Sequence, residues 1–114
     1  MRPISPMKRG EIWWVEFDPA VGSEIRKTRP AVILSNDAAN RNLARLVVVP
    51  LTSNTAQVYP GEALVSIAGV QSKAMADQIM AADKKRLKSR LGVLSAADMR
   101  AVEDAVVLHL GMRR

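Results

Sequence analysis

Alternation of apolar and polar positions predicts β-strands in the first half of the chain. The segment Glu11–Phe17 reads EIWWVEF, and every second residue from Trp13 onward is apolar, which is the period of a strand. The intervening positions are also partly apolar, so we expect both faces of this strand to be covered in part. Two runs rich in β-branched residues, Pro30–Leu34 and Leu46–Leu51, are typical of strands buried on both faces. They should form the middle of the sheet.

Turns and a further strand are predicted around these runs. The segment Pro19–Thr28 has no periodicity and should be an exposed, mobile loop that joins two antiparallel strands. Short polar side chains at positions 35–37 can cap a single helical turn that ends at Asn40. Alternation returns in Glu62–Ile67, which predicts a fourth strand.

Helical spacing marks the last part of the chain. Ser95 followed three residues later by Asp98 resembles a capping box at the start of a helix, and Gly111 should end it. Between them, apolar residues recur at helical spacing: Met99, Val102, Val106 and Leu110. A short helical turn is also predicted over Asp83–Lys88. Five of the seven residues at positions 84–90 are basic and could form either a solvated face or a support for a nucleic-acid backbone: Lys84, Lys85, Arg86, Lys88 and Arg90.

Length and composition favour one domain and a polyanionic partner. A chain of 114 residues is the usual size of one domain with one core. We find no repeat or linker, so we expect residues 1–6 to be a disordered tail and residues 7–114 to form a single domain. Lys and Arg number 17 against 11 Asp and Glu, which gives a net charge of +6 and a pI near 10.3. This balance favours nucleic acid first and an acidic protein segment second.

Two absences in the sequence narrow the class of protein. The chain has no Cys, which excludes a disulfide framework, a thiolate nucleophile and a Cys-ligated zinc site. No apolar run approaches the roughly 18 residues of a membrane span, and the amino terminus lacks the apolar core of a secretion signal. We therefore expect a cytoplasmic protein that does not bind a membrane.

Several blocks of sequence occur in an order that carries a family resemblance. They read RGEIWWVEF from Arg9, PAVGSE from Pro19, TRPAVILSN from Thr28 and VPLTS from Val49, with later DQI and DKKRL segments. From about Lys8 to Met112 this ordered set resembles the MazF/PemK group of toxin endoribonucleases from bacterial toxin–antitoxin pairs. The resemblance implies an α+β, mainly β fold, namely a small SH3-like barrel or twisted antiparallel sheet with a C-terminal helix, as in PemK and CcdB-like toxins. It also favours a fifth strand over Lys73–Met80, where propensity alone would allow a helix.

Two polar residues at strand ends are the candidate catalytic groups. Arg29 precedes the second strand and Thr52 follows the third, so together they could handle a phosphate. From the residues alone, Arg29 could equally lie on the surface or pair with Glu24, and Thr52 could simply terminate its strand. The resemblance implies that Arg29 is the main catalytic group and Thr52 the second.

The chemistry implied by the resemblance is metal-independent cleavage of single-stranded RNA. The ribose 2′-hydroxyl attacks the adjacent phosphorus, the 5′-oxygen leaves, and Arg29 stabilises the charge that accumulates. Arg is a poor general base near neutral pH, so the base is unassigned, with Glu24 and Asp77 as candidates. His109 lies among apolar residues of the predicted C-terminal helix, where a structural role is expected.

Loop residues are the candidates for RNA recognition, because single-stranded RNA is read through its exposed base edges. The resemblance implies RNA contacts for six residues, each of which could instead serve ordinary turn chemistry: Ser23, Glu24, Asn36, Ser53, Asp77 and Gln78. The carboxylates are scattered without ligand spacing, so we expect no metal site and no cofactor.

Partners and alternatives complete the expectations. Adjacent Trp13 and Trp14 must point to opposite faces of a strand, so one should be core and the other should pack in a dimer interface or under a loop, with base stacking less favoured. The resemblance implies a homodimer with RNA at the subunit junction. It also implies a cognate antitoxin whose acidic and apolar disordered tail occupies the basic groove. Two alternatives stay open: a toxin of the same fold that binds DNA gyrase, and an RNA-binding module without cleavage.

Overall fold

A single curled sheet with two α-helices makes up residues 7–113, the part of the chain that the computed structural model describes. The predicted tail, Met1–Pro6, lies outside the described residues. The elements in chain order are β1 (Glu11–Glu16), β2 (Thr28–Ile33), α1 (Asp37–Asn42), β3 (Arg45–Thr52), β4 (Glu62–Ile67), β5 (Val70–Met75), the 3₁₀ turn η1 (Ala76–Gln78), β6 (Met80–Asp83), the 3₁₀ turn η2 (Lys84–Arg86), β7 (Leu87–Val93) and α2 (Ala96–His109).

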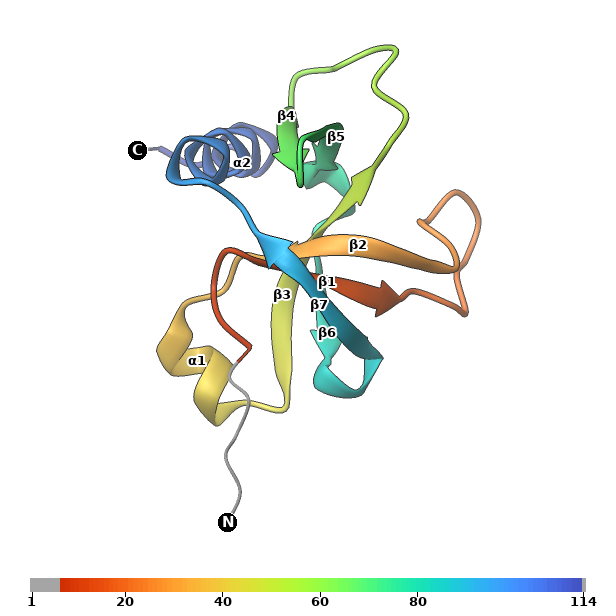
Figure 1. Cartoon of the computed structure of the whole chain (residues 1–114), viewed down its shortest axis with the longest axis vertical. Helices are drawn as coiled ribbons and strands as arrows, with labels where there is room; N and C mark the ends of the chain where they lie inside the picture. The colour runs from red at the N-terminus through yellow and green to blue at the C-terminus, as the bar shows by residue number, and fades with distance from the viewer. Residues whose placement is uncertain (1–6, 114) are drawn as a thin grey trace.

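Antiparallel pairing joins all seven strands, in the order β4-β5-β3-β2-β1-β7, with β6 added beside β3. The long strand β3 bends the sheet, because its first half pairs with β6 and its last two residues pair with β5. As a result, the β4–β5 hairpin and α2 lie above the place where β1, β2 and β7 cross β3 in Figure 1. The predicted fold, a mainly β half-barrel with a C-terminal helix, is confirmed.

Two hydrophobic clusters lie on opposite faces of this sheet, so the expectation of one core is wrong. Val32 of β2 and Val49 of β3 belong to the cluster that α2 and the β4–β5 hairpin cover. Their neighbours Ile33 and Val48 belong to a second cluster, shared with Trp13 of β1 and residues of β6 and β7. Side chains alternate across a strand, so the middle strands are buried on both faces as predicted, and each fully buried aliphatic side chain stabilises the fold by roughly 1.5–3 kcal/mol.

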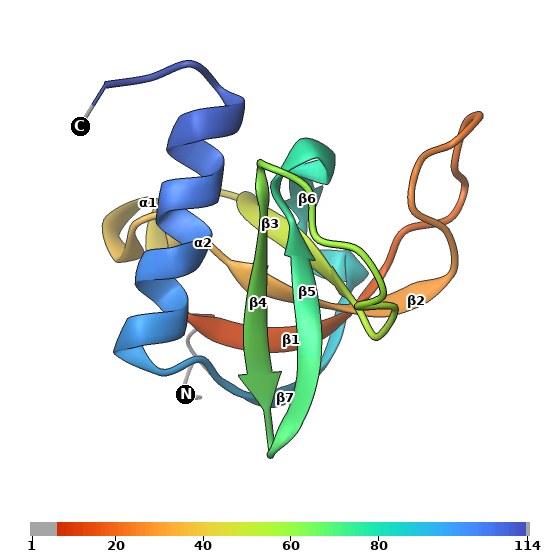
Figure 2. The same ribbon diagram turned by 90° about the horizontal axis from the view of Figure 1, so that it is seen from above.

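Both predicted helices form, with the expected caps. The Asn36 side chain accepts a hydrogen bond from the amide of Ala39 at 2.8 Å, and α1 continues to Asn42, two residues beyond the predicted turn. The Ser95 hydroxyl accepts from the amide of Asp98 at 3.1 Å. Figure 2 shows α2 running beside β4. Of the helices in residues 7–113, none has the length and hydropathy that crossing a bilayer requires.

The predicted fifth strand over Lys73–Met80 is wrong as a single element. The chain pairs as β5 with β4 and the end of β3, turns through η1, and pairs as β6 with the beginning of β3. One straight strand could not follow both ends of the bent β3. The break occurs in a run of Ala and Met, which are poor strand formers, and it places Asp77 and Gln78 on a turn.

A seventh strand, β7, was missed because it carries the basic run. The predicted helical turn shrinks to η2, and the chain then pairs with β1 from Leu87 to Val93. The apolar residues of β7, Leu87, Leu91 and Val93, lie at alternate positions, but only Leu87 is buried, and the basic residues between them obscured the pattern. Charged residues are typical of an edge strand. The register shifts twice along β1, which indicates bulges that weaken any sequence pattern further.

Candidate active site

The sheet register brings the two candidate catalytic residues to the same place. Ala31 pairs with Pro50 in the antiparallel β2–β3 ladder, so continuing the register by two residues sets Arg29 opposite Thr52. Both residues line one cavity of about 250 Å³ together with residues of β1, β2, β3 and β5: Trp14, Thr28, Pro30, Leu51, Ser53 and Ser72. Residues from four strands therefore converge on the predicted catalytic pair.

Hydrogen bonds hold Arg29 and Thr52 without using all of their donors. Arg29 is half-buried, and its Nε donates to the carbonyl oxygen of Arg26 at 3.1 Å. Among the described residues it forms no ion pair with a carboxylate, and the Glu24 carboxylate instead accepts from the amide of Val21 at 2.7 Å. The Thr52 hydroxyl oxygen accepts from the amide of Asn54 at 3.2 Å, which leaves its proton free to donate. The cavity thus offers a guanidinium and a hydroxyl to an anionic oxygen.

A second cavity, of about 270 Å³, gathers three of the predicted RNA-binding residues. Glu24 of the β1–β2 loop and Asp77 and Gln78 of η1 line it. The side-chain Oε1 of Gln78 accepts a hydrogen bond from the backbone amide of Ile25 at 3.3 Å, so η1 holds the middle of the loop. Figure 1 shows that this loop extends well beyond the sheet, and most of its residues are exposed, as predicted.

Arg86 fixes the root of the same loop. Its Nη1 donates to the carbonyl oxygens of Glu16 at 2.9 Å and Asp18 at 2.8 Å, and the side chain also lines the second cavity. A single guanidinium therefore joins η2 to the end of β1, where the loop begins. The sequence identified Arg86 only as one member of a basic run. Its partners Glu16 and Asp18 lie 70 and 68 residues away along the chain, and no sequence spacing predicts a contact over that separation.

The remaining predicted residues lie in different places. Ser53 lines the first cavity beside Thr52. Ser23 is exposed in the β1–β2 loop. Asn36 caps α1 beyond the opposite end of β2 from Arg29, so one subunit does not bring it together with the others. Sequence reasoning also left Trp14 and Ser72 outside the catalytic set, although the alternation of β1 placed Trp14 on the face away from Trp13.

His109 lies outside both cavities. It is exposed in the last turn of α2 and lies beside Gly61, so it is not a core histidine, and its predicted structural role stays a prediction. In residues 7–113 no group of three or more His, Cys, Asp or Glu side chains is arranged to hold a metal ion.

Comparisons with known proteins agree on one group of relatives. The sequence profile of the family described as PemK-like, MazF-like toxin of type II toxin–antitoxin systems matches residues 8–110. Endoribonuclease MazF9 of Mycobacterium tuberculosis is 45% identical over 115 aligned residues, which cover 93% of this chain and 98% of the relative.

Solved structures show the same likeness. The crystal structure of MazF from Deinococcus radiodurans superimposes with a TM-score of 0.85 at 28% identity, covering 96% of this chain and 100% of that one. An endoribonuclease in complex with its cognate antitoxin, from a mycobacterial species, superimposes with a TM-score of 0.78 at 26% identity, covering 94% and 97%.

Proposed function

This chain belongs to the PemK-like, MazF-like toxin family and is thereby an endoribonuclease toxin, and we propose that it cleaves single-stranded RNA at defined sequences without a metal ion. The observation that carries the proposal is the shared cavity of Arg29 and Thr52. In the cell, this activity would act in the cytoplasm on cellular RNA and so inhibit translation and growth. We further propose that residues 7–114 form a single endoribonuclease domain.

The reaction draws its nucleophile from the substrate. The 2′-hydroxyl of the ribose attacks the adjacent phosphorus, and the bond from phosphorus to the 5′-oxygen breaks. The products are a 2′,3′-cyclic phosphate and a 5′-hydroxyl. The Arg29 guanidinium stabilises the charge that builds on the phosphoryl oxygens, since its donors form a fork that suits two of them. Thr52 donates a further hydrogen bond there with the proton that its contact with Asn54 leaves free.

Proton transfer falls to a group other than this pair. The guanidinium keeps its proton near neutral pH, and a neutral threonine hydroxyl is a weak base. Glu24 and Asp77 are the carboxylates that face the neighbouring cavity, and a loop movement on RNA binding would be needed to bring either to the 2′-hydroxyl. Apo geometry alone does not exclude such a base.

The second cavity and the β1–β2 loop beside it recognise the RNA sequence in this proposal. Glu24, Asp77 and Gln78 offer both donors and acceptors to the edges of splayed bases, and Ser53 and Ser23 extend this contact set along the strand. The connection from Gln78 to Ile25 means that bound RNA is read by two segments that already support each other. Asn36 stays outside the contact set of one subunit.

Two protein partners follow from the family and from the surface. We propose a homodimer, to which the carboxyl end of α2 contributes exposed apolar side chains: Leu108, Leu110 and Met112. We also propose a cognate antitoxin whose acidic and apolar tail competes with RNA for the basic surface, supported by the net charge of +6 and by the mycobacterial toxin solved with its cognate antitoxin.

The test is incubation of the purified protein with a long single-stranded RNA in EDTA, followed by mapping of the ends produced. We expect discrete cuts with 2′,3′-cyclic phosphate and 5′-hydroxyl ends, and no cuts in DNA of the same sequence, which lacks the nucleophile. Arg29→Ala should lower the rate by about 10²–10³-fold, the usual effect of removing one oxyanion donor. Arg100→Ala, which removes an exposed Arg on α2, is the matched control and should cut normally. Cleavage only after addition of Mg²⁺ would overturn the mechanism.

A further inference from the structure

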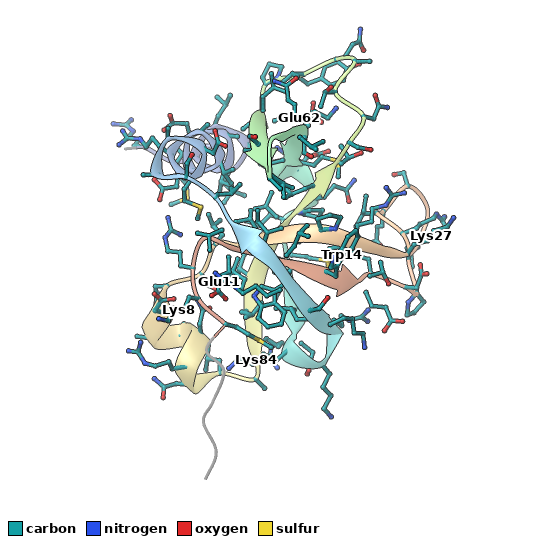
Figure 3. All side chains as sticks on the ribbon, in the orientation of Figure 1. Lys8, Glu11, Trp14, Lys27, Glu62 and Lys84 are labelled. Carbon is teal, nitrogen blue, oxygen red and sulfur yellow. The ribbon has the colours of Figure 1, made fainter. Side chains whose placement is uncertain are left out.

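The two adjacent tryptophans have opposite environments. Trp13 is 8% exposed within the second hydrophobic cluster, and its indole Nε1 donates to the Glu11 carboxylate at 3.0 Å. Trp14 points to the other face of β1 and is 37% exposed. Figure 3 shows it on the part of β1 and β2 that faces the β1–β2 loop, whereas Glu11 lies toward the opposite end of β1. Burial in the hydrophobic cluster accounts for Trp13, but it does not account for the exposed indole of Trp14.

Trp14 lies in the candidate active site. It lines the cavity that contains Arg29 and Thr52. Across the antiparallel ladders it pairs with Pro30 on β2 and with Ser89 on β7. Because β1 is paired with a strand on each side, the backbone position of Trp14 is fixed. A rigid apolar ring thus stands beside a guanidinium and hydroxyl groups at one open site.

We propose that Trp14 stacks on the base of a nucleotide next to the scissile phosphate. The inference rests on the proposed ribonuclease function and adds a residue to its substrate contacts. Proteins that bind single-stranded RNA hold unstacked bases on aromatic side chains, and such stacking tolerates any base because every base has a π face. In this arrangement Arg29 holds the phosphate and Trp14 holds the adjacent base, which fixes the ribose between them.

The polar lining of the cavity favours RNA over a protein contact at this position. If Trp14 were buried against a second copy of the chain, the contact would also cover Arg29, Thr52, Ser53 and Ser72, which line the same cavity. Burial of such groups without new hydrogen bonds is unfavourable. A nucleotide supplies both an apolar face for the indole and phosphate and ribose oxygens for the polar groups.

The first measurement is the affinity for an uncleavable substrate. A short RNA that spans a mapped cut site, with 2′-deoxyribose at the cleaved position, is titrated in a polarisation assay. Trp14→Ala should raise Kd by about 5- to 150-fold, which corresponds to about 1–3 kcal/mol for one stacked base. Trp14→Phe should keep most of the affinity. Leu91→Ala, which removes a side chain of similar exposure, 40%, on β7, is the matched control and should bind as the unchanged protein does.

Two further readouts separate stacking from a structural role. The bound RNA should quench tryptophan fluorescence in the unchanged protein, and Trp14→Phe should abolish this quenching, because Trp13 is buried. Size-exclusion chromatography should give the same oligomeric state for all variants. Unchanged affinity of Trp14→Ala, quenching that persists in Trp14→Phe, or dissociation of Trp14→Ala alone into monomers would each overturn the inference.

The proposed function and the inference fail in different ways. Intact RNA after incubation with the unchanged protein contradicts the ribonuclease, whereas the fluorescence and affinity changes at Trp14 can then be measured with an unstructured single-stranded RNA, because stacking tolerates any base. Normal cleavage by Trp14→Ala with unchanged affinity contradicts the stacking role and leaves the ribonuclease intact.

Discussion

Replacement of Lys73 by Met should strongly destabilise the fold, because Lys73 is one partner of a nearly buried ion pair. Lys73 lies opposite Thr52 in the β3–β5 pairing, and its Nζ is 3.2 Å from the Glu62 carboxylate. The same Nζ donates to the carbonyl oxygen of Gln57 at 2.9 Å and lies 5.9 Å from the centre of the Tyr59 ring. Figure 3 shows Glu62 at the base of the loop between β3 and β4. One ammonium group therefore ties that loop to the hairpin beside the catalytic strand.

The magnitude follows from burial of the partner. The side chains of Lys73 and Glu62 are 10% and 11% exposed, so Met at position 73 would keep the packing of the aliphatic stem but leave a nearly buried carboxylate without its cation, held only by the Tyr59 amide at 2.8 Å. Breaking a buried pair in this way costs about 3–5 kcal/mol. The residual exposure puts the expected loss at the low end, about 3 kcal/mol, which is a large part of the roughly 5–15 kcal/mol that stabilises a typical domain.

The assay is urea denaturation at neutral pH, with the free energy of unfolding taken by linear extrapolation. The matched control is Lys88→Met, which breaks the exposed pair with Glu16, 3.6 Å apart and 50% exposed on each side, and should cost about 1 kcal/mol or less. Combining Lys73→Met with Glu62→Leu should recover part of the loss, because no buried charge is then left over. Equal losses for Lys73→Met and Lys88→Met, or a double variant weaker than Lys73→Met alone, would refute the reasoning.

Two other predictions concern the stability of the fold at low pH and the β1–β2 loop. The amide of Arg9 donates to the Asp37 carboxylate at 2.7 Å and lowers its pKa below the ordinary 3.8, against a smaller opposing effect of desolvation. Asp37 thus stabilises the fold above its unfolded pKa and loses this effect as the pH falls through the lower folded pKa. Urea titrations should show Asp37→Asn less stable than the parent at pH 7 and the gap closing in strong acid; a constant gap would contradict this. Arg86→Gln should lower kcat/KM for RNA cleavage by about tenfold, since hydrogen bonds to Glu16 and Asp18, each worth about 1 kcal/mol, then no longer hold the loop root; a rate equal to that of Lys85→Ala would contradict that role.

The parts of the fold that sequence could predict are those with strong local patterns. The caps at Asn36 and Ser95 use side chains whose hydrogen bonds are formed within three residues, so their signals are local. The run Leu46–Leu51 is apolar because both of its faces are covered, and its strand assignment is confirmed. The second cluster could not be predicted from length, because a bent sheet divides its buried residues between two faces without any change in composition.

In the candidate site, too, the residues with local sequence signals could be predicted and those that depend on distant contacts could not. Arg29 and Thr52 could be proposed because the family resemblance marks them and each adjoins a well-marked strand, and antiparallel pairing then brings them opposite one another. The contact of Arg86 with the end of β1 joins distant segments, which leaves no periodic signal, and the apolar alternation of β7 was obscured by its basic residues. Asn36 matches a family motif, and its side chain is used by a helix cap in this subunit, so its contact with RNA stays a prediction.

The sheet packs against a hydrophobic cluster on each face, so its residues tolerate fewer substitutions than the loops do. A slip of one residue in β2 or β3 would exchange the side chains of the two clusters, so the spacing of Arg29 and Thr52 is fixed by stability as well as by chemistry. The β1–β2 loop and η1 carry no such double constraint. On the proposed assignment of the site, substitutions in these segments can therefore change the cleavage sequence without disturbing the spacing of Arg29 and Thr52.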